Sequence, residues 1–215
     1  MPNVRPKKIK SWAELRAGIT PGMPGEGGER IPWTWYSRKT YIDAVTTSLV
    51  FFDATGVPTT TNMQAASQIP APMFFDVYHL GVYFDLPPSV TAIVAAAGIT
   101  GAIDDLVNLV DGVVRFNVAQ KRYWESPIWQ APAGAGVVSR MAAAGTYTAT
   151  DGDWFNHAIN GLPDLRNRLN FWGDITIPHN QHFEVTLDWA SAVNTAVGNV
   201  DIIVYLEGFL YRRVL

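Results

Sequence analysis

Residues 183–189 read FEVTLDW, and this short stretch decides the class of fold. Apolar residues occupy its first, third, fifth and seventh positions, and polar residues occupy the three positions between them. A period of two places all the apolar side chains on one face of a strand. The stretch therefore predicts a β-strand with one buried face and one solvated face.

The same alternation extends outward from this stretch in both directions. After a loop, residues 200–213 (VDIIVYLEGFLYRR) alternate again, and so do residues 41–52, which are rich in β-branched side chains. Residues 73–84 are apolar on both faces, so we expect both faces of that strand to be covered. Shorter strands are predicted at 113–118, 123–130, around Tyr147 and at 174–177.

One stretch has helical rather than strand periodicity. Between Ser89 and Asp111, apolar residues recur at helical spacing, and Gly112 is a favourable residue just beyond a helix end. The rest of the chain lacks the strand–helix–strand rhythm of a parallel sheet. One helical excursion is therefore expected within an otherwise all-β chain.

About eight strands separated by long loops predict an antiparallel sandwich or barrel. Strands of ten or more residues favour the two-sheet jelly roll over the immunoglobulin type, whose Cys–Trp–Cys pattern is excluded because the chain has no cysteine. The preferred prediction is an all-β, eight-stranded, antiparallel jelly-roll sandwich. Another sandwich and a barrel are the alternatives.

The first 36 residues differ from the rest. Residues 19–33 contain four glycines and three prolines, which disfavour both a helix and a central strand. We therefore predict an extended N-terminal arm over residues 1–36 and a jelly-roll domain over residues 37–215. Large aromatic side chains in such an arm need a surface on which to dock; they are Trp12, Trp33 and Trp35.

The charge of the chain is unevenly distributed. The first ten residues carry +4, whereas the whole chain carries −3, so the remainder carries −7. Basic tails bind polyanions or acidic neighbours. Contact of the arm with nucleic acid or with an acidic neighbouring subunit is therefore expected. The basic residues are Arg5, Lys7, Lys8 and Lys10.

Charged residues make up 16% of the chain, against a usual value of about 25%. Aromatic residues make up 12%. A surface with little charge and many aromatics is typical of a protein that buries much of its surface against partners. A large core beneath an uncharged polar surface is the alternative.

Few residues suggest chemistry. His179 and His182 are candidate metal ligands, but their spacing differs from the His-x-His pair of metal-binding jelly rolls. Asp151 and Asp153 flank a glycine, which is typical of a turn and less so of a calcium site. Nucleotide-binding, metalloprotease and nucleophile-elbow motifs are absent. The chain is predicted not to be an enzyme and to need no cofactor.

No transmembrane segment is expected. The longest uncharged apolar stretch, residues 86–103, is interrupted by two prolines and two glycines and is short for a spanning helix.

The end of the chain carries a family resemblance. Residues 177–181 (IPHNQ) lead into the strand at 183–189, and the last strand closes with Gly208 followed by FLYRR. These final 40 residues resemble the closing strands of single jelly-roll capsid proteins from tailless icosahedral viruses of bacteria and archaea. In that family a Pro-Asn-Gln-like corner opens one strand, and the last strand ends in glycine, aromatic and basic residues. The chain is too short for the double jelly-roll type.

The resemblance implies a structural virion protein that self-assembles into a shell by lateral packing and arm exchange. Its expected partners are copies of itself and other virion proteins, and its expected location is the virion, assembled in the host cytoplasm. The alternatives are a minor virion or tail-associated protein, a carbohydrate-binding sandwich, and a glycan-active enzyme on the same sandwich.

Overall fold

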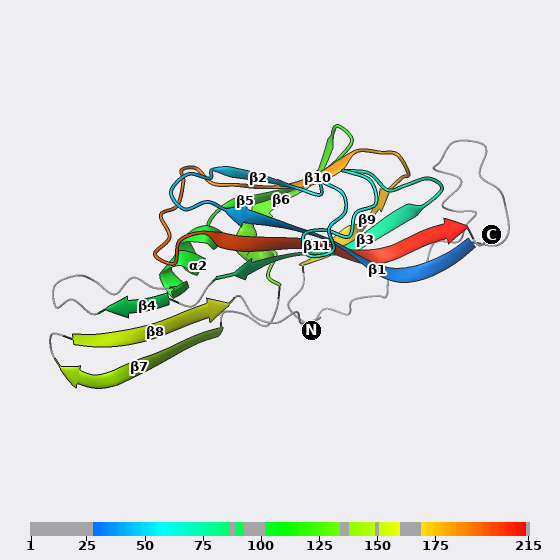
Figure 1. The fold of residues 1–215 in the computed structure, drawn as a ribbon. Coiled ribbons are helices and arrows are strands. Elements are labelled where there is room, and N and C mark those ends of the chain that lie inside the picture. Colours follow the sequence, from blue (N-terminus) through cyan, green and yellow to red (C-terminus); the bar gives the residue numbers. More distant parts are fainter. Residues whose placement is uncertain are drawn as a thin grey trace.

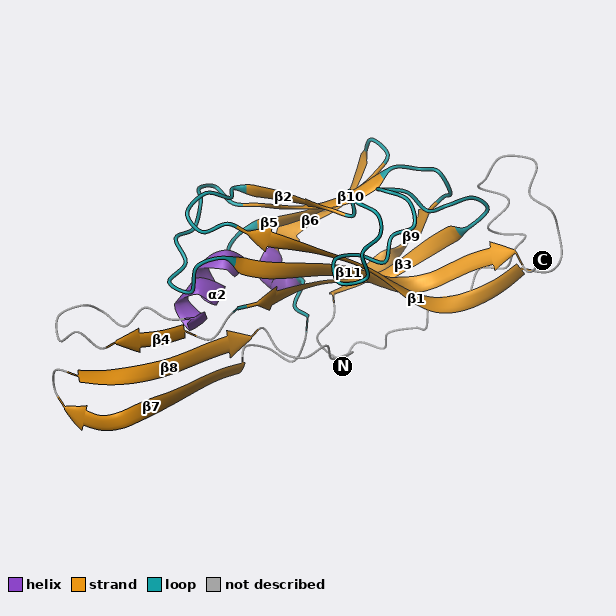
Figure 2. Ribbon diagram, viewed as in Figure 1, coloured by secondary structure: helices purple, strands orange, loops and turns teal. Residues whose placement is uncertain are grey.

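The computed structural model describes residues 28–86, 89–92, 102–133, 138–148, 151–159 and 169–213. Two antiparallel four-stranded sheets face each other and form a sandwich, with a smaller third sheet beside it (Figures 1 and 2). No helix within these ranges is long and apolar enough to span a membrane.

The first sheet has the strand order β1-β11-β3-β9, and the second has the order β2-β10-β5-β6. Every neighbouring pair in both sheets is antiparallel. The strands of the first sheet are β1 (Gly28–Tyr41), β11 (Val200–Arg213), β3 (Phe74–Asp85) and β9 (Leu169–Ile177). Those of the second are β2 (Ser48–Phe51), β10 (Phe183–Asp188), β5 (Val113–Val118) and β6 (Lys121–Pro127).

The pairings of these strands are nested along the chain. β5 and β6 form the innermost hairpin, β3 pairs with β9 around it, and β2 pairs with β10 outside the β3–β9 pair in chain order. The outermost pair is β1 with β11, which runs in register from Gly28–Arg213 to Tyr41–Val200. The two ends of the described chain are therefore adjacent strands.

Two insertions interrupt this nested order. The first, between β3 and β5, contains β4 (Ser89–Ala92) and the helix α2 (Ala102–Val110); the second, between β6 and β9, contains the 3-10 helix η1 (Ile128–Gln130), β7 (Val138–Thr148) and β8 (Asp151–Ile159). β4 pairs with β8, which also pairs with β7, so the two insertions together build the third sheet. This sheet lies beside α2 in Figure 1.

The hydrophobic core lies between the first and second sheets. In β10 and β5 every second residue is buried, because one face of the second sheet packs on the core and the other is solvated. Aromatic side chains fill much of the space between the sheets. The largest fully buried ones are Trp35, Tyr41, Phe51, Phe52, Phe75, Phe84, Phe116 and Phe183.

Several sequence predictions are confirmed. The alternating stretches at 183–189 and 200–213 form β10 and β11, and the two-sided apolar stretch at 73–84 forms β3, whose residues are mostly buried on both faces. Helix α2 occupies only the end of the expected helical stretch, which begins instead with the strand β4. Asp151 and Asp153 lie at the start of β8 rather than in a turn.

The predicted single strand over residues 41–52 is wrong. The chain turns over residues 42–47, where the backbone N–H groups of Val45 and Thr46 both donate to the carbonyl of Ile42, and then enters the second sheet as β2. Ala44 adopts a positive φ of 54° in this turn. The alternation of apolar and polar residues continues through this turn from β1 to β2. The sequence therefore resembles one strand, although its two parts belong to different sheets.

The predicted arm boundary is also wrong for residues 28–36, which form the first part of β1. Pro32 is tolerated because β1 is an edge strand with a single neighbour. Residues 34, 36 and 38 direct backbone groups away from β11 toward residues 60–62. Pro32 is also an even-numbered residue of β1, so its backbone nitrogen points away from β11 in the same way. The N–H group that proline lacks is therefore not needed for pairing with β11. Residues 1–27 lie outside the described residues.

Candidate functional site

The predicted arm residues divide into two groups. Arg5, Lys7, Lys8, Lys10 and Trp12 lie outside the described residues.

The other two arm tryptophans lie on β1. Trp35 is fully buried and packs edge-on against Phe75, whereas Trp33 is 37% exposed and packs edge-on against Trp35 with ring centroids 5.6 Å apart. Trp35 is therefore a core residue, and Trp33 alone of this pair contributes to a surface.

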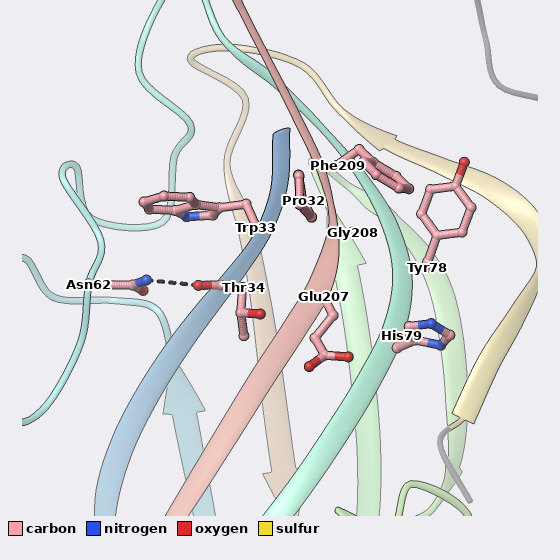
Figure 3. A pocket seen from close by; sticks show the side chains of 9 residues that line it. All are labelled: Pro32, Trp33, Thr34, Asn62, Tyr78, His79, Glu207, Gly208 and Phe209. Carbon is pink, nitrogen blue, oxygen red and sulfur yellow. Dashed lines mark hydrogen bonds between the residues drawn. The ribbon is translucent and has the colours of Figure 1, made fainter. Parts of the chain in front are cut away.

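A groove crosses β1, β11 and β3 near Trp33, with a volume of about 570 Å³ (Figure 3). A β-bulge creates it: Glu207 faces His79 and Gly208 faces Val77, so Tyr78 is an extra residue on β3. Gly208 lies directly against the backbone carbonyl of Asp76, where no side chain fits. The groove is lined by Pro32, Trp33, Thr34, Asn62, Tyr78, His79, Glu207, Gly208 and Phe209.

The groove combines aromatic rings with a carboxylate and an imidazole. Tyr78 packs edge-on against Phe209, and the guanidinium of Arg30 lies 3.6 Å from the centre of the Phe209 ring. Glu207 and His79 are paired positions on neighbouring strands. Such a set can bind a ligand that has both polar and apolar groups, such as a sugar.

Asn62 closes the edge of the sheet beside the groove. Its side-chain carbonyl accepts a hydrogen bond from the backbone N–H of Tyr36 at 3.0 Å, and its amide group donates to the carbonyl of Thr34 at 2.8 Å. The amide thereby replaces a neighbouring strand along part of β1. Covering an edge in this way prevents uncontrolled strand pairing.

A second surface lies at the end of the sandwich where the 42–47 turn, the 190–199 loop and α2 meet, which we call the loop end. Buried Asp105 of α2 accepts hydrogen bonds from the backbone N–H groups of Ala196 and Val197, both at 3.0 Å. Asp43 accepts from the backbone N–H of Thr195 at 2.6 Å and from its hydroxyl at 3.0 Å. Two carboxylates thus fix three segments to one another.

The loop end exposes large apolar side chains. Ile42 and Val45 of the turn are 50% and 68% exposed, and Val107 of α2 and Trp129 of η1 are each 57% exposed. A hollow of about 270 Å³ lies between α2 and η1, and we call it the α2 hollow. It is lined by Val107, Asn108, Val110, Asp111 and Trp129.

The outer face of the second sheet is ionic. Arg115 forms ion pairs with Glu125 on β6 and Asp188 on β10, and Glu125 also pairs with Arg122. Asn117 donates to Glu184 on the neighbouring strand. These side chains bridge adjacent strands on a solvated face.

The candidate histidine ligands do not converge. His179 packs edge-on against Phe74, whereas the imidazole Nε2 of His182 lies 3.5 Å from the carboxylate of Glu184. Within the described ranges, no group of three or more His, Cys, Asp or Glu side chains is placed to hold a metal ion.

Comparison with known proteins adds no relative: no family model, curated protein or solved structure matches the chain.

Sequence reasoning missed both the groove and the α2 hollow. A glycine inside the alternating strand at 200–213 is a signature of a bulge, and Gly208 provides it. Trp129 near the end of an expected strand gave no comparable indication, because its exposure depends on how η1 packs beside α2.

Proposed function

We propose that the chain is a structural protein that assembles with copies of itself into a closed shell of the viral capsid kind. The observation that carries the proposal is the nested strand order of the sandwich. Counted along the chain without the insertions, the first strand pairs with the eighth, the second with the seventh, the third with the sixth and the fourth with the fifth. This nested order supports a jelly roll, the architecture of many viral shell subunits and also of lectins and cupins.

Surface composition favours the shell subunit among these jelly-roll classes. Charged residues make up only 16% of the chain, and the loop end exposes apolar side chains on a platform that Asp43 and Asp105 hold in place. Exposed apolar patches on rigid elements are typical of protein–protein interfaces. The expected contacts are copies of this chain and other virion proteins, in a virion assembled in the host cytoplasm.

The resemblance at the end of the chain agrees with this proposal. The Ile177–Gln181 corner leads from β9 toward β10, and the Gly208 to Arg213 stretch closes β11. Gly208 has a physical role here, since it permits the bulge beside β3.

Electron microscopy and light scattering of the purified full-length protein test the proposal. Shells, tubes or large discrete oligomers are expected, and a strict monomer at high concentration would contradict it. Replacing both Ile42 and Val45 by aspartate should weaken assembly, because charge would then enter an apolar contact. Val57→Asp is the matched control, since Val57 is 59% exposed but lies in the loop between β2 and β3.

The groove favours a second candidate function, the binding of a carbohydrate. Aromatic rings beside a carboxylate are typical of sugar sites, and Tyr78, Phe209 and Glu207 supply them. A glycan array probed with the full-length protein tests this candidate. Binding that Phe209→Ala abolishes would support it, and an array without hits would remove it.

A further inference from the structure

We propose that the α2 hollow receives a lysine or arginine side chain from the basic N-terminal stretch of a second copy of the chain. The inference rests on the proposed self-assembly and names one contact through which it occurs. The geometry, charge and rigidity of the hollow each support it.

The hollow has the shape and surface that a long cationic side chain requires. Trp129 presents an indole ring, and Val107 and Val110 present aliphatic side chains. Lysine and arginine bury their methylene stems on apolar surface while the charged group seeks polar contacts. A cation over an indole face is attracted to the ring, and the attraction is stronger when water is excluded.

The charge at the hollow is negative and unpaired. Asp111 directly follows α2, is exposed, and has no hydrogen bond or ion pair with any described residue. The last turn of α2 contains no basic residue, while its first turn contains Asp104 and Asp105. The carboxyl end of a helix carries partial negative charge that favours a cation. The negative charge of Asp111 therefore adds to the partial negative charge at the end of α2, a position where helices usually carry a lysine or arginine.

The walls of the hollow are held in place. The indole N–H of Trp189 donates to the carbonyl of Leu109 at 2.8 Å, and the backbone N–H of Ile128 donates to the carbonyl of Gly112 at 2.8 Å. Gly112 lies against the Trp189 ring, where a side chain would collide. These contacts join the end of α2 to η1, so a ligand would not have to order the site.

The N-terminal stretch has the complementary charge. Its first ten residues carry +4 and contain no acid, and they include Ile9 beside the basic residues. The described chain starts with β1, and the start of this strand lies at its end farther from α2 (Figure 1). The residues between Lys10 and Gly28 span up to about 60 Å when fully extended. Such a stretch is long enough to leave its own sandwich and reach the α2 hollow of a neighbour.

Charge reversal in the full-length protein tests the contact. The hollow variant is Asp111→Lys, and the arm variant combines Lys7→Glu, Lys8→Glu and Lys10→Glu. Each variant alone should associate at least about tenfold more weakly than the wild type in sedimentation velocity, since an attraction becomes a repulsion. An equimolar mixture should recover association, because the native arm of one variant fits the native hollow of the other.

Matched controls separate this contact from general charge and folding effects. Gln120→Lys adds a positive charge at the exposed turn between β5 and β6 and should associate like the wild type. Trp129→Ala should weaken association, whereas Tyr123→Ala, which removes an exposed ring from β6, should not. Asp111→Asn removes the charge with little change of shape and should give a smaller loss than Asp111→Lys.

The outcomes distinguish this inference from the proposed function. A wild type that stays monomeric contradicts self-assembly itself. A wild type that assembles together with an Asp111→Lys variant that assembles equally well overturns only the α2 contact. Recovery in a single chain carrying both sets of changes, without recovery in the mixture, would show that the arm binds its own hollow. Loss of association on nuclease treatment would assign the arm to nucleic acid.

Discussion

The two outer faces of the sandwich differ sharply, although both belong to antiparallel four-stranded sheets. On the second sheet, the outward residues of β10 and β5 are partly exposed; Arg115 forms ion pairs with Glu125 and Asp188, and Asn117 donates a hydrogen bond to Glu184. On the first sheet, β3 is largely buried on both faces, and aromatic side chains of β11 lie across it. The outer face of the second sheet is solvated, whereas that of the first sheet is packed where Tyr205 of β11 covers β3.

Tyr205 shows how closely the outer face of the first sheet is packed. It faces Gly81 on β3, and its ring occupies the space where a side chain of that residue would lie. Its hydroxyl donates to the carbonyl of Ala133 at 3.1 Å. Substitutions on the first sheet should therefore cost more stability than equivalent substitutions on the second.

The largest expected effect is that of Gly208→Ala. The new methyl group would overlap the backbone carbonyl of Asp76, and neither strand can move without breaking the sheet. We expect a loss of about 3 kcal/mol or more, at the upper end of overpacking penalties, in urea unfolding. Gly56→Ala is the control: it has open space and costs only about 1–2 kcal/mol, for its positive φ of 71°. Equal losses would show that the bulge is not closely packed.

Alkaline pH should destabilise the first sheet. Burial, assisted by the carboxylate of Asp76, raises the pKa of Tyr211 above its ordinary value of 10.0. The folded state therefore favours the neutral phenol of Tyr211. The contribution of this neutral phenol to the stability of the fold is complete below pH 10, and it is lost as the pH rises toward the pKa of the folded state. The loss should be about 1.4 kcal/mol per pH unit above 10.

Unfolding of the wild type and of Tyr211→Phe between pH 9 and 11 measures this effect. The variant should lose part of the alkaline dependence, whereas the same substitution at the exposed Tyr123 on β6 should leave it unchanged. Burial also raises the pKa of Tyr41 and Tyr83, which lie on β1 and β3, so some dependence should remain. An unchanged alkaline dependence in Tyr211→Phe would contradict the prediction.

Tyr205→Phe should cost about 1 kcal/mol, because it removes one hydrogen bond and leaves the carbonyl of Ala133 without that donor. Thr186→Val is the matched change on the outer face of the second sheet and should alter the free energy of unfolding by less than about 0.5 kcal/mol. Chemical denaturation of both variants gives the comparison. A larger loss for Thr186→Val would reverse the contrast between the two faces.

The smallest effect is expected for Arg115→Met. Its ion pairs with Glu125 and Asp188 are partly exposed, and pairs of that kind contribute about 0–1 kcal/mol. Unfolding in 1 M salt should erase the difference from the wild type, because the Debye length there is about 3 Å. A loss that persists in high salt would mean that Arg115 stabilises the second sheet by packing and not only through its ion pairs.

How much of the fold the sequence predicts depends on whether the information is local. The strands at β3, β10 and β11 follow from the alternation or two-sided apolarity of their own residues. The crossing over residues 42–47 does not, because the period of two continues on both sides of it. Likewise, the prolines and glycines before Trp33 disfavour a strand by themselves. The strand β1 forms there because it pairs with β11, which is distant in the sequence.

The candidate sites depend even more on contacts between distant residues. The groove lies at a register shift between Glu207 and Gly208, opposite Tyr78, and the two strands, β11 and β3, are far apart in the sequence. The α2 hollow needs η1 and α2 to meet, and Trp129 alone does not indicate that. The basic N-terminal residues were identified by charge alone, and their contacts remain predictions.

The nested strand pairing has a consequence for biosynthesis. Glu29 of β1 and Arg212 of β11 form an ion pair although they are 183 positions apart. Ribosomes synthesise about 5–20 residues per second, so β1 waits on the order of ten seconds or more before its partner strand emerges. The innermost hairpin, β5–β6, is complete long before then. Closure of the sandwich therefore comes after the inner hairpin has formed, and the nascent chain keeps its β1 edge open to chaperones until β11 emerges.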